Sequence, residues 1–285
     1  MLDTVSRHLT ILRSRTMSYN AGVFVSAGQA ALIDPGVFPD EITRLRTAVY
    51  EQDAEPVRLV ITHSHWDHLL GPEYFPFVPV MQQVEAEAVL AEFRPAIERQ
   101  VTDWERQNRI EREQPFFCPE PDETFGARTE LAVGNEALQL MHAPGHAPEH
   151  LVVYHPASGL LWAGDMLSDI EIPFVMHSLA SYRRTIETLA RLDVRVLVPG
   201  HGQATSDPDE ISRRFARDRA YLDRLHETVA AAVAAGRSAA ETLRASAGLS
   251  PLPGNEEPHR LNVETAFLEL SGRRDPGHEG WSRLQ

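Results

Sequence analysis

Short apolar runs and helical periodicities alternate along the first part of the chain. Val-Phe-Val-Ser at residues 23–26 and the apolar residues 30–33 flank an Ala-Gly-Gln turn, which predicts two strands. Apolar residues at helical spacing follow, with Asp40 placed to cap that helix. A further apolar run at residues 57–62 comes directly after Pro56 and predicts a buried strand. The expected order is therefore strand, strand, helix, strand.

The same alternation returns after residue 137. Runs at residues 138–142, 151–154 and 160–163 predict strands, and Ser178 is placed to open a helix. Another strand is expected at residues 194–198. In each half, strands lead to a histidine and then to a helix, which indicates a duplicated α/β architecture.

Two segments depart from this alternation. Residues 82–127 mix charges with apolar residues at helical spacing, which predicts a helical insert kinked at Pro95 and ending in a loop. This insert is interpreted either as a lid or wall of a substrate pocket, or as a solvated helical hairpin. The segment 206–285 carries helix-start signals at Asp207 and Ser238 and predicts a C-terminal helical extension. We therefore expect one domain over residues 1–205 and a helical extension over residues 206–285.

The amino-acid composition limits the kinds of molecule that the protein is expected to bind. The chain has 285 residues, and its net charge of -14 comes from 27 basic and 41 acidic residues. This charge argues against nucleic acid or an anionic membrane as the partner and favours a small-molecule substrate. Every basic residue is arginine, which excludes Schiff-base and phosphate-loop chemistries that need lysine.

Cysteine content and hydropathy indicate where in the cell the protein is expected. Cys118 is the single cysteine, so no intrachain disulfide can form. The sequence contains neither a hydrophobic leader nor an apolar run of about 18 residues. These features predict a cytoplasmic protein without a membrane span, and we expect a monomer or a homodimer.

The motif His63-Ser64-His65-Trp66-Asp67-His68 places four metal-binding side chains directly after the strand predicted at residues 57–62. Imidazole and carboxylate groups are ligands for zinc, iron or manganese. His63 and His65 are two residues apart and cannot share one face of a helix. The motif therefore predicts a metal site at the end of a strand, and the alternative is a histidine-rich polar turn.

Three later residues stand in similar settings. His146 follows Ala-Pro-Gly, Asp165 follows Trp-Ala-Gly, and His201 lies in Pro-Gly-His-Gly. With them the chain resembles the metallo-β-lactamase superfamily, whose motif H-x-H-x-D-H is followed by separate His, Asp and His. The resemblance covers roughly residues 15–205. It implies an αββα four-layer sandwich, with two mixed sheets between helices, and would make residues 1–205 the catalytic domain.

The resemblance also implies a ligand set for two divalent metal ions. The implied ligands are His63, His65 and His146 for one ion, Asp67, His68 and His201 for the other, and Asp165 as the bridge. Two carboxylates would moderate the charge of two dications among neutral imidazoles. Zinc is the first expectation, with iron or manganese as alternatives. Asp67 is in addition the candidate catalytic residue that orients the nucleophile.

The implied activity is hydrolysis of a small ester, thioester or lactone by a hydroxide shared between the ions. Asp165 stands where zinc β-lactamases have cysteine, so the metal site is similar to that of glyoxalase II. Glyoxalase II itself binds glutathione through basic residues including lysine, which this chain lacks. The alternatives are a phosphodiesterase or nuclease with the same two ions, a persulfide dioxygenase-type oxidoreductase with one iron, and a metal-stabilised binding protein.

Four further residues are candidates to support the ligands or to contact substrate. Asp34 matches a family position that supports the ligands, and its alternative is a turn aspartate before proline. His150 is expected in the core or beside the ligands. His177 and Tyr182 lie in the segment that follows Asp165, where relatives place substrate contacts. For Tyr182 a core position is the favoured interpretation.

Overall fold

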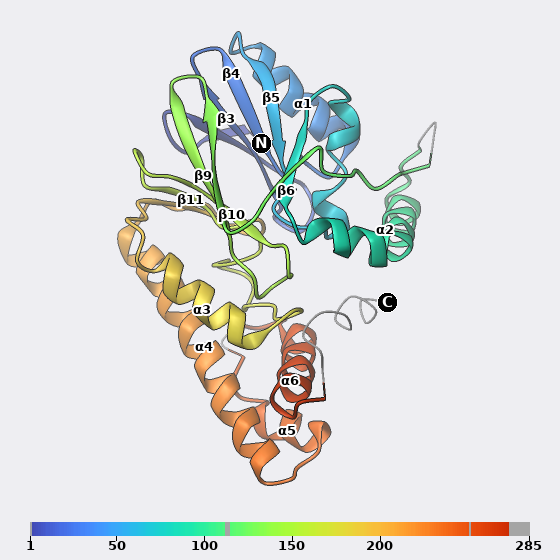
Figure 1. Cartoon of the computed structure of the whole chain (residues 1–285), viewed down its shortest axis with the longest axis vertical. Coiled ribbons are helices and arrows are strands. Elements are labelled where there is room, and N and C mark those ends of the chain that lie inside the picture. The colour runs from blue at the N-terminus through green and yellow to red at the C-terminus, as the bar shows by residue number, and fades with distance from the viewer. Residues whose placement is uncertain (1, 112–114, 251, 274–285) are drawn as a thin grey trace. The chain divides into compact units, whose positions relative to one another are not determined.

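The computed structural model describes residues 2–111, 115–250 and 252–273, and it divides into two compact units, Met1–His142 and Ala143–Gln285 (Figure 1). Each unit combines strands and helices, and the chain carries a seven-stranded and a smaller sheet. The mixed α/β class, the two sheets and the C-terminal helices were all expected and are confirmed.

The large sheet of the first unit follows chain order from β1 to β7. Its strands are β1 (Leu2–Thr4), β2 (Leu9–Arg13), β3 (Asn20–Ser26), β4 (Gln29–Ile33), β5 (Glu55–Val60), β6 (Val80–Gln83) and β7 (Glu123–Phe125). Strands β1 to β4 pair antiparallel, and β4 to β7 pair parallel. The sequence patterns missed β1 and β2, which extend the predicted pair of strands.

Helix α1 (Pro39–Tyr50) connects β4 to β5 and packs against β3 and β5. It begins at Pro39, whose fixed φ suits the first helical position. Asp40 was expected to cap this helix, but it lies inside the first turn and pairs with Arg15 at 2.8 Å. The Arg15 guanidinium lowers the pKa of Asp40 below its ordinary value.

The segment expected to be an insert, residues 82–127, connects two strands of the large sheet. Its first residues end β6 and Glu123–Phe125 forms β7, while residues 112–114 lie outside the described part of the chain. Between these strands, α2 (Ala86–Asn108) continues as one helix through Pro95. Because β6 and β7 are parallel, α2 is the crossover that parallel strands require, rather than an insertion.

Strands β8 (Arg128–Val133) and β9 (Glu136–His142) form a hairpin that completes the first unit. Gly134 in its turn has φ +57°, and a Cβ there would lie 2.0 Å from the carbonyl oxygen of Ser26. Only glycine permits this approach. Strand β8 contacts β3 and β4, so the hairpin packs onto the large sheet.

The second unit contains β10 (Leu151–His155), β11 (Leu160–Trp162) and β12 (Val196–Val198). Strands β10 and β11 pair antiparallel, while β11 and β12 pair parallel. Helix α3 (Leu179–Leu189) provides the connection between the parallel strands. Ser178 caps α3 as predicted, its hydroxyl accepting a hydrogen bond from the Ser181 N–H.

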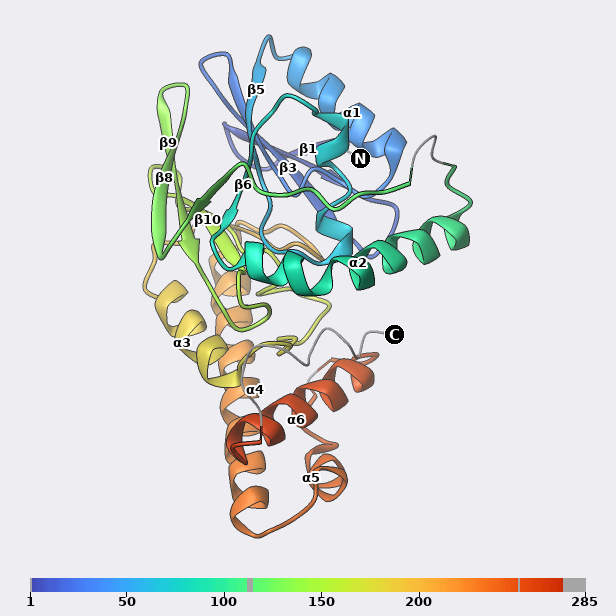
Figure 2. The same cartoon turned by 45° about the vertical axis from the view of Figure 1, so that its right-hand side comes forward.

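Three more helices complete the second unit (Figure 2). They are α4 (Pro208–Ala234), α5 (Ala239–Ser246) and α6 (Glu256–Leu270), and α4 contacts α3, α5 and α6. The predicted caps Asp207 and Ser238 are confirmed. Residues 251 and 274–285 of the predicted extension lie outside the described residues. The division at residue 205 stays a prediction. No helix in the described ranges has the length and apolar character that a membrane crossing needs.

Candidate metal centre

The first unit positions four of the predicted ligands in the loop after β5. His63 lies in irregular backbone and His65 in extended backbone, and Trp66–His68 forms a single 3₁₀ turn that carries Asp67 and His68. The side chains of all four are buried. The motif therefore lies at the end of a strand and in the loop after it, as predicted.

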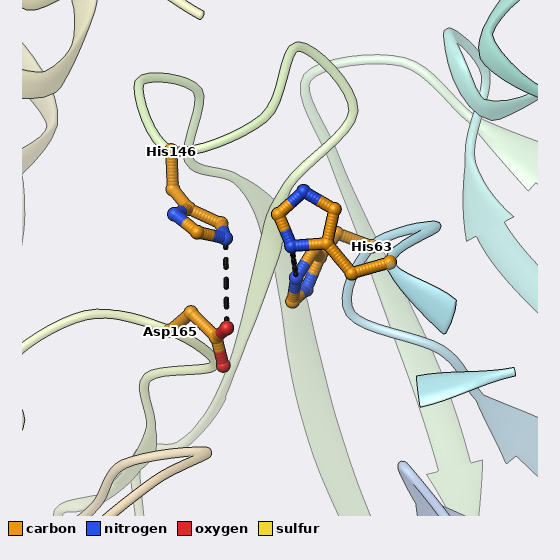
Figure 3. A group of neighbouring side chains, drawn as sticks. His63, His146 and Asp165 are labelled. Carbon is orange, nitrogen blue, oxygen red and sulfur yellow. Dashed lines mark hydrogen bonds and ion pairs between the residues drawn. The ribbon is translucent and has the colours of Figure 1, made fainter. Parts of the chain in front are cut away.

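Two pairs of donor atoms lie close together in this loop. Nε2 of His63 is 2.9 Å from Nδ1 of His65, the contact drawn beside His63 in Figure 3. Two nitrogens bound to one tetrahedral zinc at about 2.0–2.1 Å are about 3.3 Å apart, so this pair fits one ion with a small adjustment. Nε2 of His68 lies 3.8 Å from Oδ2 of Asp67 and forms the second pair.

Asp34 supports the motif from the neighbouring strand. Strands β4 and β5 are parallel with Ile33 opposite Val60, which brings Asp34 beside Thr62. The Asp34 carboxylate accepts hydrogen bonds from the Thr62 N–H (2.8 Å) and hydroxyl (2.9 Å), and its Oδ2 lies 3.3 Å from Nδ1 of His68. This is the carboxylate contact that orients a ligating imidazole.

Thr62 is a contributor that the sequence interpretation missed. Its hydroxyl lies 3.0 Å from Nδ1 of His63 and 3.4 Å from Nδ1 of His68, in addition to its bond to Asp34. One hydroxyl therefore links two predicted ligands to a carboxylate. A threonine directly before a histidine motif was the available signal.

Helix α2 packs against the 3₁₀ turn of the motif. The ring of Trp66 lies 5.3 Å from that of Trp104 on α2, and Trp104 also contacts Phe38 at 5.0 Å. Apolar residues of α2 are buried along this side. The helix is therefore part of the packing of the motif loop, which differs from a solvated hairpin.

The second unit places Asp165 between two histidines. Oδ2 of Asp165 lies 3.5 Å from Nε2 of His146 (Figure 3) and 3.6 Å from Nε2 of His201. Trp162 and Val198 are opposite one another in the parallel pair of β11 and β12, and Asp165 and His201 each follow by three residues. One carboxylate oxygen therefore faces imidazole nitrogens from two different loops.

Glycines directly before the two histidines make this approach possible. A Cβ on Gly200 would lie 2.4 Å from Oδ1 of Asp165. Gly145 has φ +144°, and a Cβ there would lie 2.4 Å from the Cα of Tyr182. Both positions therefore exclude a side chain, for reasons of space and, at Gly145, also of backbone conformation.

Hydrogen bonds to neighbouring residues fix the positions of His146 and Asp165. Nδ1 of His146 lies 2.8 Å from the carbonyl oxygen of Phe174, so a proton on Nδ1 leaves the Nε2 lone pair for a metal. The Asp165 N–H donates to Nε2 of His150 (3.1 Å), and the Tyr182 hydroxyl donates to the Asp165 carbonyl (3.2 Å). The Phe174 contact uses a backbone oxygen, which no sequence pattern reveals.

Tyr182 and His177 lie in different surroundings. Tyr182 is fully buried on α3, and burial raises the pKa of its phenol well above the ordinary value. It is therefore a neutral core residue that contacts Asp165, as the favoured interpretation expected. His177 is half-buried, and its backbone N–H donates to the carbonyl of Gly145 (3.2 Å), next to His146.

The donor chemistry of each unit suits a divalent metal ion. The histidine and aspartate side chains able to hold a metal are His63, His65, Asp67 and His68 in the first unit, and His146, Asp165 and His201 in the second. These are the ligand types of zinc, iron and manganese sites. All are buried except Asp165, which is half-buried.

Comparisons with curated proteins identify several hydrolases. The chain is 33% identical over 98 residues to a probable metallo-hydrolase of Bacillus subtilis, which covers 30% of this chain and 31% of that protein. It is 27% identical to the acyl-coenzyme A thioesterase MBLAC2 of Gallus gallus, over 51% of this chain and 56% of that one. It is 26% identical to the hydroxyacylglutathione hydrolase GloC of Haemophilus influenzae, over 62% and 82%. The chain thus spans less than two thirds of the Bacillus and Gallus proteins.

Solved structures are similar in fold. A metallo-β-lactamase family protein from Thermus thermophilus has a TM-score of 0.67 at 21% identity, over 93% of each chain. The sec-alkylsulfatase Pisa1 from Pseudomonas sp. has a TM-score of 0.70 at 18% identity, over 96% of this chain and 50% of that one. The family model described as metallo-beta-lactamase superfamily matches residues 15–201. The chain, which has the metallo-β-lactamase fold, therefore belongs to the metallo-β-lactamase superfamily.

Proposed function

We propose that the chain is a hydrolase that uses two divalent metal ions to cleave a small thioester, ester or lactone. The proposed ligands are His63, His65 and His146 for one ion, Asp67, His68 and His201 for the other, and Asp165 shared between them. Zinc is the proposed metal, because tetrahedral histidine and carboxylate sets suit it. Iron and manganese accept the same donors.

The observation that carries this proposal is the position of Asp165. Its Oδ2 faces Nε2 of both His146 and His201 at nearly equal distances, 3.5 and 3.6 Å. A single iron would use only part of the seven donors and would leave Asp67, His68 and His201 without a metal. The full donor set therefore favours a two-metal site over a site for a single iron.

The metal ions and the surrounding residues would have different roles in such a site. When bound, the ions supply a water of lowered pKa and polarise the oxygen of the substrate carbonyl. Asp34 and the Phe174 carbonyl hold the Nδ1 protons of His68 and His146, which keeps each Nε2 free to bind. Asp67 is proposed to orient the proton of the nucleophilic water.

The names of two relatives narrow the proposed substrate class. The Gallus gallus relative is named an acyl-coenzyme A thioesterase, and the Haemophilus influenzae relative a hydroxyacylglutathione hydrolase. Both names describe thioester hydrolysis, so we place thioesters first. The missing lysines weaken the case for a glutathione thioester, because arginine would have to replace them in binding.

The test combines metal analysis with a substrate panel. Purified protein would be analysed for zinc, iron and manganese, then assayed on acyl-coenzyme A thioesters, S-lactoylglutathione, lactones, p-nitrophenyl esters and bis(p-nitrophenyl) phosphate. We expect two ions per chain and the highest kcat/KM on a thioester. Asp165→Asn should lower kcat/KM by about 100-fold or more, since even residues that only support metal ligands contribute about 10- to 100-fold.

Asp103→Asn is the matched control, because Asp103 is exposed and pairs with Arg106 on the surface of α2. Its activity should equal that of the native protein. One iron per chain with oxygen uptake on a persulfide would replace the hydrolase by an oxidoreductase. Preference for the phosphodiester would replace it by a phosphodiesterase, and metal binding without turnover of the panel would leave a binding protein.

We further propose a cytoplasmic location, a monomer or homodimer, and a partner that is a small molecule rather than nucleic acid. The net charge of -14 supports the last point. Residues 1–205 are proposed as the catalytic domain and residues 206–285 as its helical extension.

A further inference from the structure

One edge of the C-terminal helix carries three polar side chains at intervals of seven residues. They are Asn255, which directly precedes α6, and Asn262 and Glu269 within the helix. All three hydrogen-bond to one irregular segment, residues 170–180, which leads from Asp165 to the first turn of α3. We call these three residues the α6 ladder.

Both asparagines bind the backbone of the segment in the same way. Asn255 accepts from the Ile172 N–H (3.0 Å) and donates to the Ile170 carbonyl (3.1 Å). Asn262 accepts from the Val175 N–H (2.7 Å) and donates to the Pro173 carbonyl (2.6 Å). An asparagine amide offers one acceptor and two donors. Each side chain can therefore satisfy one backbone N–H and one carbonyl of the segment, as a neighbouring strand would do in a sheet.

The repeat distances of helix and segment match. Seven residues of an α-helix rise about 10.5 Å, and three residues of extended chain cover about 10 Å. The bonded positions on the segment are likewise three residues apart, from Ile172 to Val175. The spacing of the two asparagines therefore keeps the segment extended and in one register.

Glu269 ends the ladder at the start of α3. Its carboxylate accepts from the Leu179 N–H (2.7 Å), the Ala180 N–H (3.2 Å) and the Ser178 hydroxyl (3.1 Å). A negative charge at the first turn of a helix is favourable because N–H groups there lack helical partners. The end of the segment is thereby held to α6 as well.

The segment held in this way contacts the loop of His146 directly. The carbonyl of Phe174, between the residues that Asn262 binds, is 2.8 Å from Nδ1 of His146. The N–H groups of His177 and Ser178 both donate to the Gly145 carbonyl, at 3.2 and 3.3 Å. Asn262 itself is fully buried and also donates to the Tyr221 hydroxyl on α4 (2.8 Å).

We propose that Asn262, with Asn255 and Glu269, is a positioning residue for the metal ligand His146. By holding residues 173–175, Asn262 places the Phe174 carbonyl so that it retains the proton on Nδ1 of His146 and leaves Nε2 free. Helix α6 then acts on the metal site through the backbone of residues 173–175. The role of His146 as a ligand rests on the proposed function, whereas the effect on its ring does not.

The experiment compares Asn262→Leu with Val263→Ala. Leucine has a similar size but removes every hydrogen bond of the amide, whereas Val263 is equally buried on α6 and has no polar side-chain group. In metal-free protein, ¹⁵N NMR of the histidine rings should show His146 protonated on Nδ1 in the native chain and in Val263→Ala. In Asn262→Leu the population with the proton on Nε2 should rise.

Zinc and cobalt binding give the second readout. Asn262→Leu should bind one of the two ions about 10- to 100-fold more weakly, and its cobalt(II) absorption spectrum should change. If the leucine variant fails to fold, Glu269→Ala, at a half-buried position, tests the same series of contacts from α6 to His146. An unchanged His146 tautomer in the variants would overturn the inference, even where metal binds. Failure of the native chain to bind metal would overturn the proposed function alone.

Discussion

Replacing Asp34 by asparagine should weaken metal binding at His68 by reversing one hydrogen bond. Oδ1 of Asp34 accepts from the Thr62 N–H at 2.8 Å, so the amide oxygen of the variant must keep that place. The NH₂ group then takes the place of Oδ2, which lies 3.3 Å from Nδ1 of His68. If the amide were flipped, its NH₂ group would face the Thr62 N–H, and two donors would oppose each other.

The NH₂ group donates, so it favours His68 with a bare Nδ1 and the proton on Nε2. That tautomer cannot bind metal through Nε2, the atom that faces Asp67. In the variant the binding tautomer lacks the hydrogen bond that Nδ1–H of native His68 donates to the charged Asp34 carboxylate, which contributes about 1.5 to 3 kcal/mol. This corresponds to about a 10- to 100-fold loss of affinity, the range typical of residues that support metal ligands.

The assay is a competition titration of metal-free protein with zinc and a chromophoric chelator. One of the two dissociation constants should rise by the stated factor in Asp34→Asn. Asp40→Asn is the control, because Asp40 is exposed and pairs with Arg15 on the surface. Equal zinc affinities in native and Asp34→Asn protein would refute the role assigned to Asp34.

Three further predictions concern the second unit. Gly200→Ala should weaken zinc binding in the same titration, because its Cβ would lie 2.4 Å from Asp165, while Gly248→Ala, with open space around it, should not. Tyr182→Phe should lower the free energy of unfolding in urea by about 1 kcal/mol through loss of one buried hydrogen bond. Burial raises the pKa of Asp218 to about 6. The same carboxyl in the unfolded chain ionises near pH ~4. As the pH rises from about 4 to about 7, this group should therefore lower the free energy of unfolding by up to about 3 kcal/mol. Asp218→Asn should remove this contribution, and the prediction is contradicted if the free energy of unfolding in urea depends on pH in the same way in the variant and the native protein.

Much of the fold follows from local patterns in the sequence. The apolar runs around the Ala-Gly-Gln turn became β3 and β4, and Ser178, Asp207 and Ser238 cap the helices that they were expected to cap. Such signals act over a few residues, where side-chain chemistry decides the backbone. The segment 82–127 contains a helix as predicted, but the short strands near its two ends were missed because their partners lie far away in sequence.

For the candidate site, the sequence by itself determined the kind of chemistry. Histidine and aspartate at His63, His65, Asp67 and His68 are a dense set of metal donors, and the later His and Asp residues made the family resemblance specific. Donor identity is a property of side chains, which is why it can be read without coordinates. The sequence also placed the motif at the end of a strand, where the structure has it.

Only the tertiary structure decided how these donors are aimed. The register of β11 and β12 sets His201 beside Asp165, and the Phe174 carbonyl meets His146 because Asn262 on α6 holds the backbone of Pro173 and Val175 on either side of it. Strand register and backbone hydrogen bonds depend on groups that every residue shares, so the identity of the side chains does not reveal them. The spacing of Asn255, Asn262 and Glu269 becomes meaningful only when the segment they bind is known.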